Sequence, residues 1–229
     1  MNIATTYLDG QDLAALIFFI LCWVGYSYFA EHKTQYDKSL LGVTNRYRML
    51  WIREMVRREN RTMDAIMIGN LQRSITFFAN TTIFILIGLV SMLSYYDRSS
   101  AIINNIPFAK LSTPFSWEVK IFLLIMVFIY AFFKYTWSLR QYNYAGIFVN
   151  SIPPYNQLPT DSEAIISKGA YLASNAAQHF TSGLRAYYFG LAALAWFIHP
   201  YFFITATAWI VFVTHRREYH SKTLANLAN

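Results

Sequence analysis

The chain of 229 residues contains a single cysteine, Cys22, which lies inside a long apolar segment. An intrachain disulfide is therefore excluded, and so is a CxxC metal or redox site, because each of these needs two cysteines. The simplest interpretation of this residue is a buried and unreactive thiol.

Catalytic signatures are also missing. The sequence has no GxSxG, no P-loop and no GxGxxG motif, which excludes the common nucleophile and nucleotide-binding patterns. The five histidines include no pair at helical i, i+4 spacing and no HExxH motif; they are His32, His179, His199, His215 and His220. We therefore expect a non-catalytic protein without a metal or other cofactor. The alternatives are haem ligation and a metal site built from distant histidines.

Acidic residues are few, with 12 Asp and Glu against 19 Lys and Arg, and the net charge is +7. None lies in the middle of an apolar segment, since Glu118 and Glu218 are at segment ends. Proton-coupled pumps and cation transporters normally use a carboxylate inside the membrane, so coupled cation transport is disfavoured. Nucleic acid is not an expected partner, because the basic residues flank apolar segments, where they contact anionic lipid and set topology.

Apolar residues, by contrast, make up 55% of the chain, and charged residues only 14%. Four long apolar blocks cover residues 13–30, 75–95, 121–133 and 186–213. The second block runs about twenty residues without a charge, which is the length a helix needs to cross about 30 Å of hydrocarbon. We predict an all-α, polytopic transmembrane helical bundle, with residues 1–229 forming a single integral membrane domain.

The last block is long for one crossing, at about 28 residues or about 42 Å of helix. Pro200 lies near its midpoint. One interpretation is a single tilted helix that is kinked at proline, which gives four crossings. The other is a hairpin that turns at His199 and begins its second helix at Pro200, which gives five. We favour the hairpin, because it returns Arg216 and Arg217 to the side of the other basic segments.

Basic residues predict the orientation. Nine of them lie in residues 31–74, and short loops rich in Lys and Arg stay in the cytoplasm. We therefore expect residues 31–74 and 140–185 to be cytoplasmic and the N-terminus to be outside. The expected location is the inner (plasma) membrane of the cell.

The third crossing is predicted to run from about Glu118 to Leu139. Pro153 and Pro154 then mark a break in the second cytoplasmic segment. A further helix is expected after this break, with Asp161 or Ser162 as its N-cap.

Residues 31–74 also predict a cytoplasmic amphipathic helix. Its apolar residues repeat at multiples of four, namely Tyr47, Trp51, Met55, Met63 and Met67. We expect this helix to lie on the inner leaflet. The residues expected at the lipid interface are Trp51, Arg53, Arg57, Arg58 and Arg61. The alternative is a helix that packs on the bundle or on a partner subunit.

Polar side chains form two stripes near the cytoplasmic ends of predicted crossings: Arg73, Thr76 and Asn80 in one, and Lys134, Ser138 and Gln141 in the other. Facing each other, these stripes would line an inward-facing polar vestibule; the alternative is interhelical hydrogen bonds with snorkelling cations. Arg185, just before two tyrosines, predicts either a lipid headgroup site or an ordinary aromatic belt. The resulting candidate polar cluster is Arg73, Asn80, Lys134, Arg140, Gln141, Arg185, Tyr187 and Tyr188.

Several stretches resemble one family. The runs are RSITFFANTTIFILIGL, FFKYTWSLRQYNYAG, HFTSGLRAYYFGLAALAWFIHPYFF and RREYHSK. Together they resemble the membrane-protein family catalogued as domain of unknown function 599, over about residues 10–222. The resemblance implies a multi-pass helical inner-membrane protein and no particular reaction. The residues that match its blocks are Arg73, Phe77, Phe78, Lys134, Trp137, Arg140, Gln141, Arg185, Tyr187, Tyr188 and Arg216.

The first functional hypothesis is a non-catalytic accessory or scaffold subunit of a membrane complex, or a lipid-interacting component. Its expected partners are the lipid bilayer, anionic phospholipids, and partner membrane subunits or further copies of the chain. A second hypothesis is a transporter or channel for a small anionic or neutral solute, with Arg73, Lys134, Arg140 and Arg185 at its inner mouth. A third is a membrane redox enzyme or metal-binding subunit, which rests only on the histidines.

Overall fold

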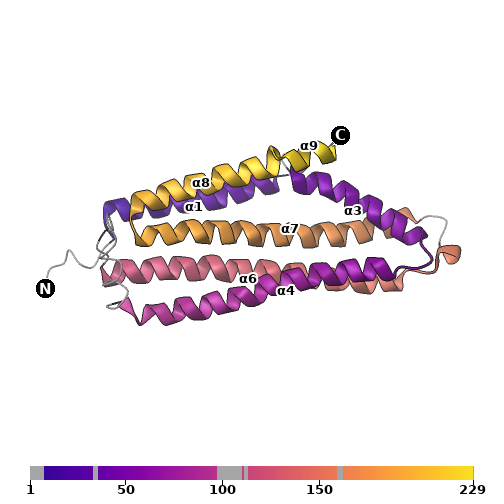
Figure 1. Cartoon of the computed structure of the whole chain (residues 1–229), viewed down its shortest axis with the longest axis horizontal. Helices are drawn as coiled ribbons and strands as arrows, with labels where there is room; N and C mark the ends of the chain where they lie inside the picture. Colours follow the sequence, from indigo (N-terminus) through magenta and orange to yellow (C-terminus); the bar gives the residue numbers. More distant parts are fainter. Residues whose placement is uncertain (1–7, 33–35, 97–109, 111–112, 159–161, 229) are drawn as a thin grey trace.

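The structure is a computed structural model that describes residues 8–32, 36–96, 110, 113–158 and 162–228. These residues form helices and no strands, which confirms the predicted all-α fold (Figure 1). The long helices are α1 (Gly10–Glu31), α3 (Leu40–Arg57), α4 (Thr62–Leu93), α6 (Pro114–Ser151), α7 (Glu163–Leu194) and α8 (Pro200–Tyr219). The short ones are η2 (Tyr155–Gln157), η3 (Ala195–Phe197) and α9 (Lys222–Ala228).

Three of the described helices, α1, α4 and α6, are long and apolar enough to cross a membrane. At 1.5 Å per residue, α4 is about 48 Å long and α6 about 57 Å, against about 30 Å of hydrocarbon. Large apolar side chains point away from the bundle, and Phe84 is 73% exposed. An outer surface of this kind is unfavourable in water and favourable in lipid. These helices indicate a membrane protein.

The last apolar block contains the last turns of α7, the turn through η3 and most of α8, and α7 and α8 run side by side (Figure 1). The chain turns through η3, and the His199 side chain caps α8 by accepting the Tyr201 N–H at 3.2 Å. Pro200 is the first residue of α8, where a missing N–H leaves no helical hydrogen bond unmade. The predicted hairpin is therefore confirmed, and the single kinked helix is wrong.

At the end of the bundle that holds α3, called here the α3 end, three helices continue past the ends of α1 and α8 (Figure 1). α6 runs on to Ser151 rather than stopping near Leu139, because Tyr142, Ala145 and Val149 continue its buried face. The chain then breaks at the two prolines, and α7 begins directly after Ser162, as predicted. The Ser162 side chain makes no capping hydrogen bond, and Asp161 lies outside the described residues.

The prediction of a single amphipathic helix within residues 31–74 is wrong in one respect, because two helices occupy this segment. α3 ends at Arg57, and α4 begins at Thr62 after a turn. The side chain of Asn60 accepts the Thr62 N–H at 2.9 Å, which supports the start of α4. Met63 therefore lies on α4, apart from the apolar face of α3.

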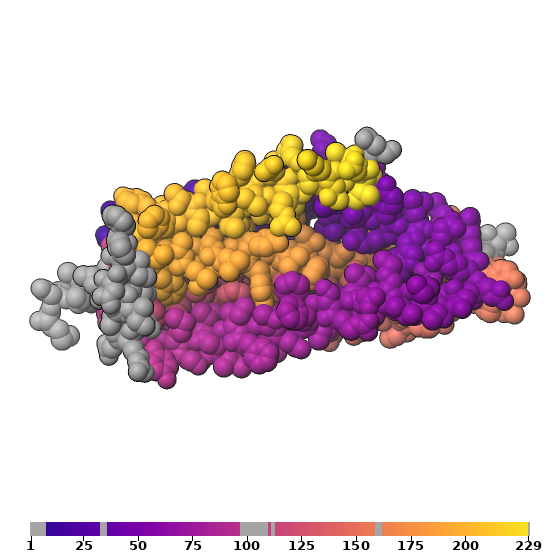
Figure 2. Space-filling view, viewed as in Figure 1, coloured from indigo at the N-terminus to yellow at the C-terminus, as the bar shows by residue number. Residues whose placement is uncertain are grey.

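α3 packs on the bundle, as in the second of the two alternatives for this helix. Its residues Ile52, Met55 and Val56 are buried, with exposures of 2%, 0% and 1%. The contact with α7 is close, since a Cβ at Gly169 would lie 3.0 Å from Ile52 Cγ2. In the space-filling view, α3 and the first turns of α4 cover the α3 end (Figure 2).

Aromatic rings fill the space between α4, α6 and α7. Phe78 stacks on Tyr135 with ring centroids 5.5 Å apart, and Phe180 and Tyr187 pack around the same two rings. The Tyr187 hydroxyl lies 2.7 Å from the Thr82 Oγ1 atom. This cluster joins the three helices at mid-height of the bundle.

Candidate functional site

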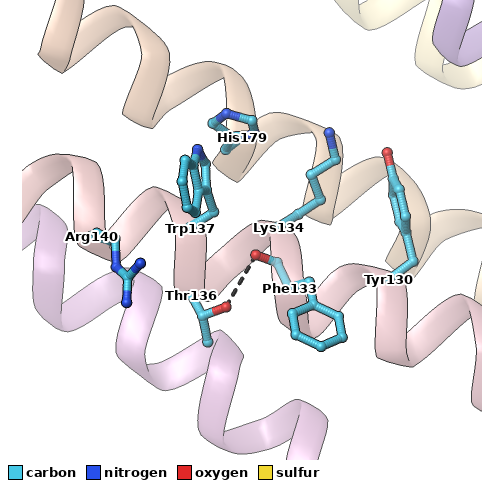
Figure 3. A pocket seen from close by; sticks show the side chains of 7 residues that line it. All are labelled: Tyr130, Phe133, Lys134, Thr136, Trp137, Arg140 and His179. Carbon is cyan, nitrogen blue, oxygen red and sulfur yellow. Dashed lines mark hydrogen bonds between the residues drawn. The ribbon is translucent and has the colours of Figure 1, made fainter.

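A groove of about 580 Å³ lies along α6 where it meets α7 (Figure 3). We call it the α6 groove. Most of its α6 residues are three or four positions apart, so they lie on one side of that helix. The lining residues are Tyr130, Phe133, Lys134, Thr136, Trp137 and Arg140 from α6 and His179 from α7.

The α6 groove is basic, with two cations and no carboxylate in its lining. Lys134 Nζ lies 5.3 Å from the ring centroid of Tyr130, and Arg140 Cζ lies 5.7 Å from that of Trp137. Neither cation forms a salt bridge within the described part of the chain. Both therefore have N–H donors available for an anion, in positions fixed by cation–π contacts.

His179 brings a third nitrogen-bearing side chain to the α6 groove. Its ring stands beside that of Trp137, with centroids 6.2 Å apart and planes nearly perpendicular (Figure 3). Its Nδ1 atom is buried and has no hydrogen-bond partner in the described residues. Burial lowers the pKa of His179, and the charge of Lys134 lowers it further, against an opposing effect of Glu31. Burial therefore favours the neutral form of the imidazole.

A second polar site lies between α1, α7 and α8. Arg185 donates from Nε to Glu218 Oε1 at 2.7 Å and from a terminal nitrogen to Glu218 Oε2 at 3.1 Å. The Tyr26 hydroxyl donates to Glu218 Oε2 at 2.9 Å. The side chains of the ion pair are only 5% and 15% exposed. Because Arg185 has a carboxylate partner, it holds helices together rather than offering donors to a ligand.

The eight residues of the predicted polar cluster do not form one site. Lys134 and Arg140 line the α6 groove, whereas Arg185 and Tyr188 line a smaller cavity next to α8. The exposed Arg73 side chain donates to Asn70 on its own helix. The remaining members are Asn80, exposed on α4, Gln141, buried on α6, and Tyr187, in the aromatic cluster.

The two predicted polar stripes also do not face each other. The Ser138 hydroxyl donates to the Ala176 carbonyl at 2.6 Å, so this side of α6 faces α7 and not α4. Sequence reasoning did not connect His179 with Lys134. No local signal was available for that contact, because it depends on how α7 is rotated against α6.

The residues predicted at the lipid interface all have partners within the protein. Trp51 Nε1 and a terminal nitrogen of Arg58 each donate to Asp64 Oδ1 at 2.7 Å, and this carboxylate is buried. The guanidinium of Arg61 donates to the carbonyl oxygens of residues 152 and 153, both at 2.8 Å, just past the end of α6. The other two pairs are Arg53 with Glu163 and Arg57 with Glu54. Contact of these side chains with lipid stays a prediction.

A further polar group, which sequence reasoning missed, lies at the opposite end of the bundle. Asp12 is buried and accepts hydrogen bonds from Trp196 Nε1 at 2.7 Å and from Lys110 Nζ at 3.2 Å. Lys110 also pairs with Asp9 at 2.7 Å, and this contact lowers the pKa of Asp9. The group ties α1 to the turn between α7 and α8.

The fold and the site define a helical-bundle protein of membrane type with a basic groove on its side. The chain belongs to the family described as "Protein of unknown function, DUF599", whose model matches residues 14–223. The resemblance seen in the sequence is thereby confirmed. No curated protein and no solved structure gives a significant match to the chain.

Proposed function

We propose that this protein is a non-catalytic integral membrane protein that binds an anionic, phosphate-bearing group in the α6 groove. The observation that carries the proposal is the composition of the groove: two cations with available donors, an indole N–H and a histidine, with no carboxylate. Such a set of donors suits a phosphate oxygen. A site of this kind fits an accessory, scaffold or lipid-interacting component of a membrane.

The height of the α6 groove in the bundle supports this proposal. The Ser182 hydroxyl donates to the Glu31 carboxylate at 2.8 Å, and Glu31 is the last residue of α1. His179 lies less than one turn away from Ser182 on α7. The groove is therefore level with the end of an apolar helix. If α1 crosses the bilayer, this is the level of the lipid headgroups.

We infer further that α1, α4, α6, α7 and α8 each cross the inner membrane and that the α3 end faces the cytoplasm. The support is the excess of Lys and Arg in residues 31–74. On this inference the N-terminus lies outside.

The transporter alternative has less support. Aromatic rings occupy the space between α4, α6 and α7, where a solute path would have to pass. Arg73, one of the four residues assigned to an inner mouth, lies on the exposed side of α4. The α6 groove is on the side of the bundle, where it meets lipid rather than a central channel.

Replacing Lys134 and Arg140 together with alanine should weaken binding to the α6 groove by about 30-fold. Each basic residue near an anionic surface contributes about 1 kcal/mol, and about 1.4 kcal/mol corresponds to tenfold in affinity. The measurement is retention of phosphatidylglycerol against phosphatidylcholine by the purified protein, detected by native mass spectrometry.

The matched control for that experiment is Arg73→Ala with Lys168→Ala, which removes the same charge from two exposed positions outside the groove. This control should retain phosphatidylglycerol as the wild type does. Equal losses in both double variants would show that only overall charge matters, and they would contradict the proposed site.

Anion binding should also strengthen as the pH falls. A phosphate in the groove stabilises the protonated His179, so the pKa of His179 is higher in the bound state than in the free state. Linkage then requires tighter binding at low pH, complete once the pH is below the free-state pKa, which burial places under the ordinary value of about 6.5. We expect a gain of about threefold to tenfold between about pH 8 and pH 5.

The control for the pH profile is His179→Gln. Lys134 on α6 and Glu31 on α1 are the charged groups that act on His179, and both are unchanged in this variant. Its affinity should vary much less with pH than that of the wild type. Two superimposable profiles would show that His179 does not contribute.

A further inference from the structure

The α6 groove changes character along its length. Arg140 and Trp137 lie toward the α3 end of α6, Lys134 lies in the middle, and Phe133 and Tyr130 lie toward the apolar part of the helix (Figure 3). The end that we place at the membrane surface is therefore basic, and the end that reaches toward the hydrocarbon is aromatic. A ligand that fills the groove must therefore be anionic at one end and apolar at the other.

The length of the groove also restricts the ligand. Arg140 follows Tyr130 by ten positions in α6, which is about 15 Å along the helix. The headgroup region occupies only about 5–8 Å on each side of the hydrocarbon core. A free phosphate would fill the basic end alone and would leave the exposed ring of Phe133 without a partner.

The charge of the groove restricts the headgroup. Zwitterionic headgroups carry an ammonium group next to the phosphate, and this group needs an acidic or aromatic partner of its own. The Trp137 ring at the basic end is already covered by Arg140, and Lys134 lies over the ring of Tyr130. No carboxylate lines the groove, so the ammonium group of such a headgroup would be repelled by Lys134 and Arg140.

We infer that the ligand of the α6 groove is an anionic phospholipid without a cationic headgroup substituent, its phosphate among Lys134, Trp137, Arg140 and His179 and one acyl chain against Tyr130 and Phe133. This inference rests on the proposed function and adds the acyl chain to it. The chain provides affinity through the apolar surface that it covers, and the phosphate fixes the lipid at the headgroup level.

The first experiment locates the acyl chain. Nanodiscs are prepared with phosphatidylglycerol that carries a photoactivatable diazirine in the upper part of one chain, and the full-length protein is irradiated and digested. Mass spectrometry should find the adduct on the peptide that contains residues 130–133, and less of it in Lys134→Ala/Arg140→Ala. Adducts spread evenly over α1, α4 and α6 would overturn the inference.

The second experiment separates the acyl chain from the phosphate. Phe133→Ala should weaken retention of phosphatidylglycerol about fivefold and leave the weak binding of water-soluble glycerol 3-phosphate unchanged. Phe77→Ala is the matched control, since Phe77 on α4 is 66% exposed and Phe133 is 65% exposed. It should change neither measurement.

The outcomes distinguish the two proposals. If glycerol 3-phosphate binds as tightly as the full lipid and depends on Lys134, the acyl chain has no role, and the inference fails while the proposed anion site stands. If neither probe depends on Lys134 and Arg140, both proposals fail.

Discussion

Replacing Glu218 with alanine should lower the free energy of unfolding by about 3–5 kcal/mol, because it leaves the guanidinium of Arg185 buried without its carboxylate. The pair is bidentate, with nitrogen–oxygen distances of 2.7 and 3.1 Å, and Arg185 is 5% exposed. Tyr26 loses its acceptor in the same variant. The pair joins α7 to α8, and Tyr26 adds α1, so the loss should loosen all three helices.

Unfolding in mixed micelles of mild detergent and dodecyl sulfate, followed by circular dichroism, measures this effect. Glu54→Ala is the control, since Glu54 pairs with Arg57 on the surface of α3 at 3.5 Å, and exposed pairs contribute only about 0–1 kcal/mol. The double variant Arg185→Met/Glu218→Leu should recover much of the stability, because no unpaired charge is left. A loss in Glu218→Ala no larger than that in Glu54→Ala would mean that the pair does not hold the helices.

Replacing Gly183 with alanine should lower the free energy of unfolding by about 1–3 kcal/mol, because a methyl group does not fit between α7 and α6. Its Cβ would lie 2.6 Å from a ring carbon of Tyr135. Tyr135 is fully buried and packs against Phe78 and Phe180, so its ring cannot move aside without disturbing the aromatic cluster.

Gly88→Ala is the matched control on α4. A Cβ at Gly88 meets nothing within 4 Å, and alanine is the better helix former by about 1 kcal/mol. This variant should be as stable as the wild type or more stable. Smaller residues at position 135 should reduce the effect of Gly183→Ala, and a double-mutant cycle with Tyr135→Leu measures this coupling. Additive effects in that cycle would show that the predicted clash is absent.

The parts of the fold that could be predicted from the sequence are those that local rules determine. Proline at position 200 lacks a backbone N–H and is suited to the first turn of a helix, so the hairpin was predictable from one residue and the block's length. The two prolines marked the break before α7, but the end of α6 was expected near Leu139 and lies at Ser151. The 3.6-residue repeat, in contrast, could not show that α3 stops at Arg57. That end depends on Asp64, which accepts from Trp51 and Arg58 across the turn.

The candidate site could be predicted only in part, for a related reason. Lys134 was expected near the cytoplasmic end of its helix and Arg140 just past that end, whereas both lie within α6, which runs on to Ser151. The stripe on α4 that was expected to face them does not do so, since the rotation of each helix is set by contacts between distant segments. The stripe around Ser138 turns toward α7 because Gly183 and Ala176 let the two helices approach closely. The place of His179 beside Trp137 follows from the same approach.

The packing of α1 has a consequence for how the protein is assembled during synthesis. α1 lies mainly against α8, which begins about 170 residues after α1 ends. At about 5–20 residues per second, a ribosome needs roughly ten to thirty seconds to make the intervening chain. During that interval Trp196 and Glu218, which hydrogen-bond to Asp12 and Tyr26, do not yet exist, although Lys110, which also contacts Asp12, is made earlier. The first helix must therefore wait in the bilayer without α8 beside it, which makes a nascent chain stalled before residue 196 a natural substrate for membrane chaperones and quality-control proteases.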